Sequence, residues 1–178
     1  IAGVLGANLY RLLGKKTGAE SKDLKQGNTK LHSKENLPDE NDEYSSEANI
    51  LNEEDNFSKD TFLEGAKKAF RIIVSSYKEN KIDTAENLLS PKVLKAFEEQ
   101  TNLNDKKLKS FHITELKASI VNIEIVKKLA KIKVKFLSTQ KNTFEKKSET
   151  QKLEDIWIFE KMLGNQNPNW VLAEVSAE

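Results

Sequence analysis

The sequence lacks cysteine altogether and contains only two histidines, His32 and His112, which lie far apart. Without cysteine the chain has no disulfide and no thiolate nucleophile, and a zinc site would lack its commonest ligand. Two separated histidines are also too few for a histidine-based zinc or iron centre. We therefore predict neither a metal nor another cofactor, and we interpret His112, at the start of a predicted strand, as a structural or exposed residue.

Arginine is also scarce, because 27 of the 29 basic residues are lysines. Tight phosphate-binding sites usually rely on the planar fork of arginine. The formal net charge of +1 hides an asymmetry, since residues 1–57 carry a net charge of −4 and residues 58–178 carry +5. The later part is thus suited to an anionic partner. It lacks the arginines and interleaved aromatic residues of a nucleic-acid-binding surface, so nucleic acid is not favoured.

The longest mostly apolar stretch, IAGVLGANLYRLL, occupies residues 1–13. As a helix it would span roughly 20 Å, short of the ~30 Å hydrocarbon core of a bilayer. Lys15 and Lys16 follow it, as expected at the cytoplasmic end of a membrane helix. We predict that residues 1–19 are the end of an N-terminal membrane anchor with its basic flank, and that the native N-terminus lies upstream. A signal-peptide remnant and a surface amphipathic helix are the alternatives.

Residues 20–57 are polar and show no sustained hydrophobic period. Eight carboxylates and no Lys or Arg lie between Asp39 and Asp55. Such a segment buries too little apolar surface to offset the entropy lost on ordering. We predict a disordered acidic tether over residues 20–57.

The remaining residues, 58–178, begin with helical signals. Ser58, Asp60 and Thr61 are candidate N-caps, and Thr61 with Glu64 fits a capping box. Apolar residues then recur at helical spacing through Tyr77. A short helix is predicted over residues 83–89. Another begins at Ser90-Pro91, an N-cap followed by proline at the first helical position.

From Ile113 the hydrophobic period changes to two, which predicts strands. The alternation slips near Val121-Asn122, which predicts a β-bulge. Ile132, Val134 and Phe136 then alternate with lysines, and later strands are predicted over residues 153–159 and 170–175. Helices followed by an antiparallel sheet define an α+β domain.

Several motifs occur together in the order seen in Tim44-like domains. The domain carries FLEGAKKAF (residues 62–70), LLSP (88–91), KIKVKFLS (131–138) with DIWIFEK (155–161), and NPNW (167–170); before it comes LGKKTG (13–18). The chain therefore resembles a bacterial, membrane-anchored member of the Tim44-like domain family.

The resemblance implies a cone of N-terminal helices on a curved antiparallel sheet, similar to nuclear transport factor two. It implies a place at the bacterial inner membrane with the domain on the cytoplasmic side, or at the matrix side of the mitochondrial inner membrane. It also implies binding to anionic, cardiolipin-like lipid and to a protein client or translocase subunits. The long charged helical region by which mitochondrial members contact the import chaperone is missing, so chaperone recruitment is not implied.

Two sets of candidate site residues lie in the predicted domain. The lysines are candidates for binding lipid or another anionic partner, with a solvated strand face as the alternative: Lys127, Lys128, Lys131, Lys133 and Lys135. The aromatic residues are candidates for lining a pocket, with ordinary core packing as the alternative: Phe70, Trp157, Phe159 and Trp170.

These features favour a non-enzymatic, membrane-tethered adaptor. A ribosome-associated or RNA-contacting module at the membrane is the alternative from another class. A small-molecule-binding or isomerase-like domain of the same fold is a further alternative, for which Asp155, Glu124 and Tyr77 are the candidate acid–base residues. No motif fixes the spacing of these three residues, so we predict that the protein is not an enzyme.

Overall fold

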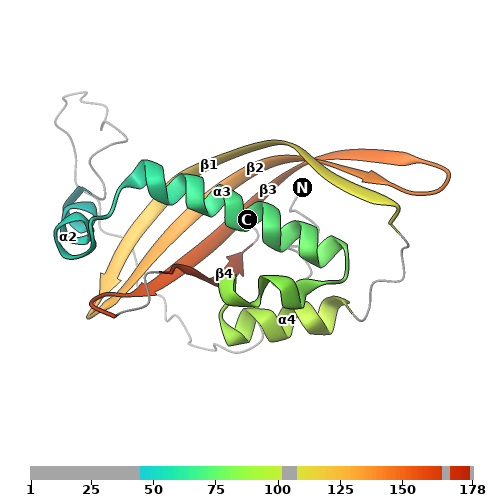
Figure 1. The fold of residues 1–178 in the computed structure, drawn as a ribbon. Coiled ribbons are helices and arrows are strands. Elements are labelled where there is room, and N and C mark those ends of the chain that lie inside the picture. The colour runs from blue at the N-terminus through green and yellow to red at the C-terminus, as the bar shows by residue number, and fades with distance from the viewer. Residues whose placement is uncertain (1–44, 102–107, 166–168, 177–178) are drawn as a thin grey trace, which may run out of the picture.

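The computed structural model describes residues 45–101, 108–165 and 169–176 (Figure 1). Helices come first and strands follow, which confirms the predicted α+β class. The elements in chain order are α2 (Ser45–Asp55), α3 (Lys59–Lys78), the 3-10 helix η1 (Ile82–Leu88), α4 (Pro91–Thr101), β1 (Ser110–Val126), β2 (Leu129–Thr143), β3 (Ser148–Met162) and β4 (Val171–Ser176).

Helix α3 forms because its apolar residues recur on one face and its first turn is capped. Ser58 is the N-cap, and its hydroxyl accepts a hydrogen bond from the backbone N–H of Thr61 at 3.4 Å. The buried face contains Phe62, Ala66, Phe70, Ile73, Val74, Ser76 and Tyr77. This periodic burial fixes which side of α3 faces the sheet.

The two following helical segments lie where the sequence predicts helices, with η1 at residues 82–88 against the predicted 83–89 and α4 starting at Pro91. Between them, Ser90 caps α4, because its hydroxyl accepts a hydrogen bond from the N–H of Val93 at 3.4 Å. Pro91 is the first helical residue, where its missing N–H costs nothing. The backbone N–H of Ser90 also donates to Leu172 O at 2.9 Å, which joins the start of α4 to β4.

The four strands form one antiparallel sheet in the order β1-β2-β3-β4. Two register shifts interrupt the β1–β2 pairing, one between Ile113 and Glu115 and one between Ile120 and Asn122. The second shift confirms the bulge predicted at Val121-Asn122. Bulges bend a strand and increase its twist, in keeping with the curved sheet of Figure 1.

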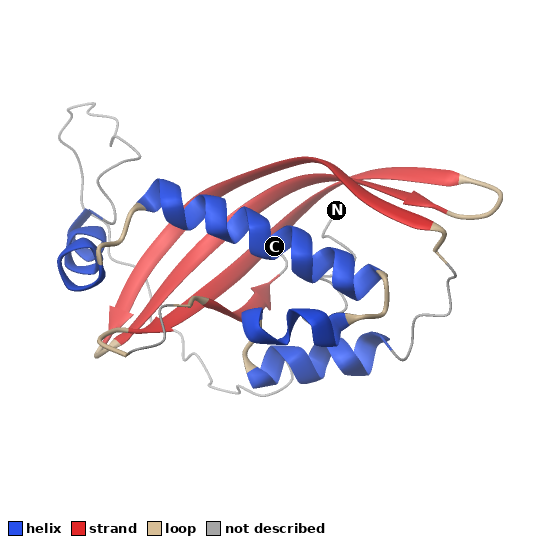
Figure 2. Cartoon of the chain, viewed as in Figure 1, coloured by secondary structure: helices blue, strands red, loops and turns tan. Residues whose placement is uncertain are grey.

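The helices cover one face of this curved sheet, while the β2–β3 hairpin projects past them (Figure 2). Helix α3 lies along the sheet, and η1 and α4 pack beside it against β4. The core between the layers includes Ile132, Val134 and Phe136 of β2, each 0% exposed. The alternation with lysines seen in the sequence thus places these three apolar residues on the inner face.

The structure corrects one predicted boundary. Residues 45–55, which were predicted to belong to the disordered tether, form helix α2. The prediction is wrong there because Ala48 and Leu51 lie one helical turn apart and are both buried, Leu51 completely. The rest of the predicted tether and the predicted anchor lie outside the described residues. Within the described ranges, none of the helices has the length and apolar character needed to cross a bilayer.

Candidate aromatic pocket

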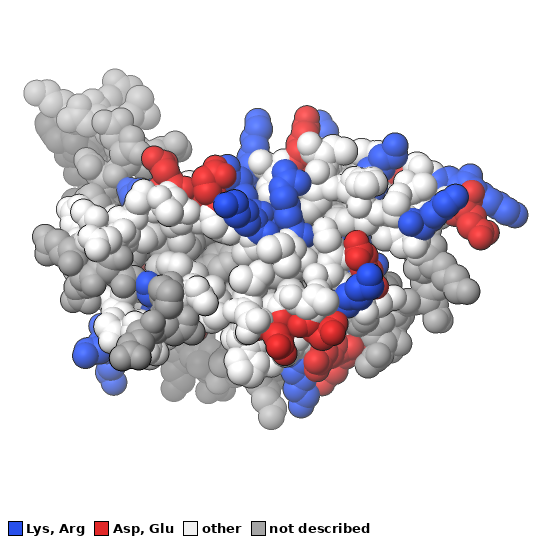
Figure 3. Space-filling model, viewed as in Figure 1, with Lys and Arg blue, Asp and Glu red and all other residues white. Residues whose placement is uncertain are grey.

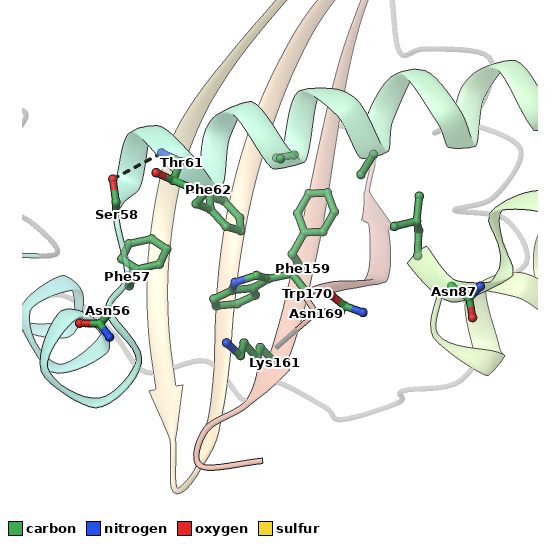
Figure 4. Close-up of a pocket in the computed structure, with 14 residues that line it drawn as sticks. Asn56, Phe57, Ser58, Thr61, Phe62, Asn87, Phe159, Lys161, Asn169 and Trp170 are labelled. Carbon is green, nitrogen blue, oxygen red and sulfur yellow. Dashed lines mark hydrogen bonds between the residues drawn. The ribbon is translucent and has the colours of Figure 1, made fainter. Parts of the chain in front are cut away.

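A pocket of about 400 Å³ lies beneath the N-terminal half of α3. Its walls come from the α2–α3 junction, α3, η1, the end of β3 and the residues before β4 (Figure 4). The lining residues are Asn56, Phe57, Ser58, Thr61, Phe62, Gly65, Ala66, Ala69, Asn87, Leu88, Phe159, Lys161, Asn169 and Trp170. Segments far apart in the sequence thus converge on one cavity.

Four aromatic rings form a continuous wall of this pocket. Phe62 is at the centre, with ring centroids 5.7 Å from Phe57, 5.9 Å from Phe159 and 5.1 Å from Trp170. The contacts of Phe62 with Phe159 and Trp170 are edge-to-face, a favoured geometry for aromatic pairs. Phe57 and Trp170 remain partly exposed, so apolar ring surface is accessible from the pocket mouth.

Polar groups stand around this aromatic wall. Lys161, from the inner face of β3, is only 8% exposed and is the one charged residue among those lining the pocket. Asn56, Asn87 and Asn169 add amides, and Ser58 is held by its capping hydrogen bond to Thr61. The pocket therefore combines an apolar surface with a few polar groups, an arrangement suited to an apolar group with polar neighbours.

The predicted pocket-lining residues divide into two pairs. Phe159 and Trp170 line this pocket, whereas Phe70 and Trp157 lie in the core and are each 0% exposed. Phe70 stacks on Phe136, and its ring centroid lies 4.7 Å from that of Trp157. These rings fill the space between α3 and the sheet, so neither Phe70 nor Trp157 lines the aromatic pocket.

The predicted lysine set also divides. Lys131, Lys133 and Lys135 lie on the sheet face opposite the core, while Lys127 and Lys128 form the turn between β1 and β2. Carboxylates interleave with the strand lysines: Lys131 pairs with Glu160 at 3.0 Å and Lys135 with Glu154 at 2.5 Å. The outer face is therefore mixed in charge and is not a plain basic surface.

The helix-covered face is mixed in charge as well. Acidic side chains stand near the start of α3 and basic side chains gather over its middle (Figure 3). Arg71 lies in α3, and its guanidinium donates to the carbonyl oxygen of Ile113 at 3.1 Å, beside the first register shift of β1. Sequence reasoning missed this contact because it joins two residues that lie far apart in the chain.

The candidate acid–base residues are placed on different sides of the molecule. Asp155 faces the core and is 1% exposed, while Glu124 lies on the outer face opposite Lys131. Burial raises the pKa of Asp155 to about 6, against the opposing effect of Lys78. Asp155 and Glu124 cannot form one catalytic pair because the sheet separates them. Tyr77 is buried against Phe97, with ring centroids 5.3 Å apart, and burial raises its pKa.

No group of three or more His, Cys, Asp or Glu residues within the described ranges is placed to hold a metal ion. Among the buried side chains described, Asp155 has no hydrogen-bond partner for either carboxylate oxygen, and Trp157 has none for its indole N–H. Neither residue lines the aromatic pocket. The pocket is thus the feature with the clearest binding geometry.

Helices packed on one face of a curved, four-stranded antiparallel sheet, with an aromatic pocket beside them, define an α+β domain like that of nuclear transport factor two. A model of the Tim44-like domain matches residues 45–177, and the chain belongs to this family. The match begins at the first residue of α2, in agreement with the corrected boundary. No curated protein matches the chain. The family is associated with the inner membrane and with protein transport.

Proposed function

We propose that this protein is a non-enzymatic adaptor in membrane-associated protein transport, and that its aromatic pocket receives an apolar segment of a client or translocase subunit. The observation that supports this proposal is the ring wall around Phe62, with part of Phe57 and Trp170 exposed at the mouth. Exposed aromatic side chains in concave sites are typical anchors for protein partners.

The pocket also favours a particular partner chemistry. Most of its lining is apolar, and the amides of Asn56, Asn87 and Asn169 and the mostly buried Lys161 add polar groups around the ring wall. A segment that presents an apolar side chain flanked by polar groups complements such a pocket. The partner segment is therefore amphipathic.

We place the domain beside the anionic inner membrane of a bacterium, on the cytoplasmic side, with the mitochondrial matrix side as the corresponding place in an organelle. Cardiolipin-like lipid is then a second partner, bound from the same membrane that holds the anchor. Membrane attachment concentrates the domain near its protein partner, so a modest pocket affinity is sufficient.

Site-specific photo-crosslinking tests this proposal. Thr61 is exposed on the pocket wall, and Glu98 of α4 is exposed but does not line the pocket. A photoreactive amino acid is placed at either position of the full chain, which is irradiated in native membranes and analysed by mass spectrometry. We expect one defined protein adduct from position 61, formed through an amphipathic segment, and none from position 98. Equal adducts at both positions, or adducts with lipid or a small molecule alone, contradict the proposal.

A further inference from the structure

The end of the sheet formed by the β1–β2 hairpin carries an unusual row of exposed apolar residues. Val126 pairs with Leu129 across the turn, and Leu129 pairs with Met162 on β3. Val126 and Met162 are each 48% exposed, and Leu129 is partly exposed. Strand alternation places all three on the outer face, so they form one apolar row across three strands.

Charged side chains border this row on both sides. Lys127 and Lys128 form the turn beyond it, and both are exposed. Behind it, Glu124 pairs in register with Lys131, which forms the ion pair with Glu160. The hydrogen bond from Lys131 to the Glu160 carboxylate raises the pKa of Lys131. The order outward from the middle of the sheet is an ion-paired row, an apolar row and then two lysines.

The backbone of Lys127 supplies an independent observation. Its φ is +59°, in the left-handed region that glycine and asparagine adopt at little cost. A lysine at this position pays a conformational cost that glycine in a hairpin turn would avoid. Backbone strain of this kind is concentrated at functional positions. Lys127 is therefore a candidate functional residue, and the feature that it adds over glycine is its charged side chain.

We propose that this hairpin end, made of Val126, Lys127, Lys128, Leu129 and Met162, inserts into the interface of an anionic bilayer. The apolar row enters the boundary between headgroups and acyl chains, and the two lysines contact lipid phosphates. The ion-paired row of Glu124, Lys131 and Glu160 stays in water and limits how deeply the hairpin end inserts into the bilayer. The outer strand lysines Lys133 and Lys135 stand farther from the tip and do not make the primary contact.

The charges around the row favour a bilayer as its occupant. Two adjacent lysines without a carboxylate in the turn complement a continuous anionic surface. Helix α2 contacts β1, and Figure 1 shows it at the same end of the sheet as this turn, opposite the β2–β3 hairpin. The chain therefore enters the domain at the end that we assign to the membrane.

This inference rests on the proposed function only in placing the domain beside a membrane. Failure of the lipid test described next leaves the pocket proposal standing, and failure of the pocket crosslinking leaves the lipid test unaffected.

The cysteine-free sequence allows single cysteines to report on each position without background. The full chain is labelled with an environment-sensitive fluorophore at Val126→Cys or Met162→Cys, and at Leu137→Cys as the control. Leu137 is 45% exposed on the same outer face, farther along β2. Each labelled protein is reconstituted into vesicles of phosphatidylglycerol and phosphatidylcholine, or of phosphatidylcholine alone, with brominated lipids as quenchers.

We expect brominated lipid to quench the labels at positions 126 and 162 in anionic vesicles, and to quench the control label far less. The pair Lys127→Glu and Lys128→Glu should abolish this quenching. The matched pair Lys146→Glu and Lys147→Glu, in the exposed turn at the other end of the sheet, should leave it unchanged. Equal quenching at all three labels overturns the proposal. A blue-shifted but unquenched label at the tip also overturns it, because a protein surface then covers the row.

Discussion

The rings of Phe70 on α3 and Phe136 on β2 stack with their centroids 4.5 Å apart and an interplanar angle of 27°. This contact joins the longest helix described to the middle of the sheet, and both side chains are 0% exposed. It holds α3 in the position from which Thr61 and Phe62 form the pocket wall. The stability of this contact and the existence of the pocket are therefore linked.

Replacing Phe136 with alanine should lower the free energy of unfolding by about 3–5 kcal/mol, because it leaves a large cavity beneath α3. Urea denaturation monitored by circular dichroism measures this change. Leu137→Ala is the matched control, since Leu137 is the next residue and is 45% exposed. A loss equal to that of the control would mean that Phe136 does not hold the two layers together.

Helix α2 should behave as part of the folded domain. Leu51→Ala is expected to cost roughly 2–4 kcal/mol because Leu51 is completely buried, whereas Ile50→Ala, at a neighbouring position that is 44% exposed, should cost far less. Amide exchange of the full chain provides a second measurement, with slowed exchange expected within residues 45–55. Exchange there at the rate of an unstructured peptide would restore the tether interpretation.

Asp155 should make stability depend on pH in the direction opposite to that of an acid whose pKa is lowered by an ion pair. Its folded pKa is about 6, above the ordinary aspartate value of 3.8, so the folded state binds the proton more tightly. The free energy of unfolding should therefore rise as the pH falls from 7 through 6, by up to about 3 kcal/mol near pH 4. Subtracting the profile of Asp155→Asn isolates this contribution. If the stability of the unaltered protein relative to Asp155→Asn instead fell as the pH dropped from 7 to 4, the assignment would be refuted.

Lys127→Gly should raise the free energy of unfolding by about 1 kcal/mol, because glycine adopts the left-handed backbone conformation without strain. Lys128→Gly is the control. Lys128 is not among the residues with positive φ, so its replacement should give no gain. Thermal melts of both variants provide the comparison. Equal changes at the two positions would show that the turn conformation of Lys127 carries no strain.

The ion pair between Lys131 and Glu160 should contribute little to stability although its atoms are 3.0 Å apart. A double-mutant cycle with Lys131→Gln and Glu160→Gln is expected to give a coupling of about 0.2–1 kcal/mol that weakens in high salt. A coupling above this range that persists in high salt would indicate a pair shielded from solvent.

Local patterns predicted much of the fold. Ser58 and Ser90 lie at helix starts because their side chains satisfy free backbone N–H groups within three residues, a relation visible in the sequence. The slip of alternation at Val121-Asn122 predicted the bulge because an extra residue in one strand shifts the inward and outward positions that follow it. Helix α2 was missed because its many carboxylates conceal the two buried positions, and its burial depends on a distant strand.

The site was harder to predict from the sequence than the fold. Trp157 and Phe159 alternate on the same inner face, but Trp157 lies beneath Phe70 and Phe159 lies beneath Phe62 beside the cavity. Periodicity gives the face of a residue and not its position along the helix that covers it. The ion pair of Lys131 with Glu160 likewise requires the β2–β3 register, which hydrophobic alternation alone does not specify.

Gly65 provides the most direct test of the central claim, that the aromatic pocket binds a protein partner. Gly65 lines the pocket on α3, and the place that a Cβ would take there has no neighbouring atom beyond its own helix within 4 Å. Gly65→Trp should fill the cavity without destabilising the domain, because glycine within a helix already costs about 1 kcal/mol relative to alanine. Gly65→Ala is the control that leaves the cavity open.

The decisive measurement is the yield of the protein adduct formed by a photoreactive residue at position 61 in each Gly65 variant, compared in native membranes beside thermal melts. We predict that Gly65→Trp abolishes the adduct and does not lower the melting temperature, while Gly65→Ala retains it. An undiminished adduct in the folded Gly65→Trp variant would contradict the account, because the partner would then bind without entering the pocket.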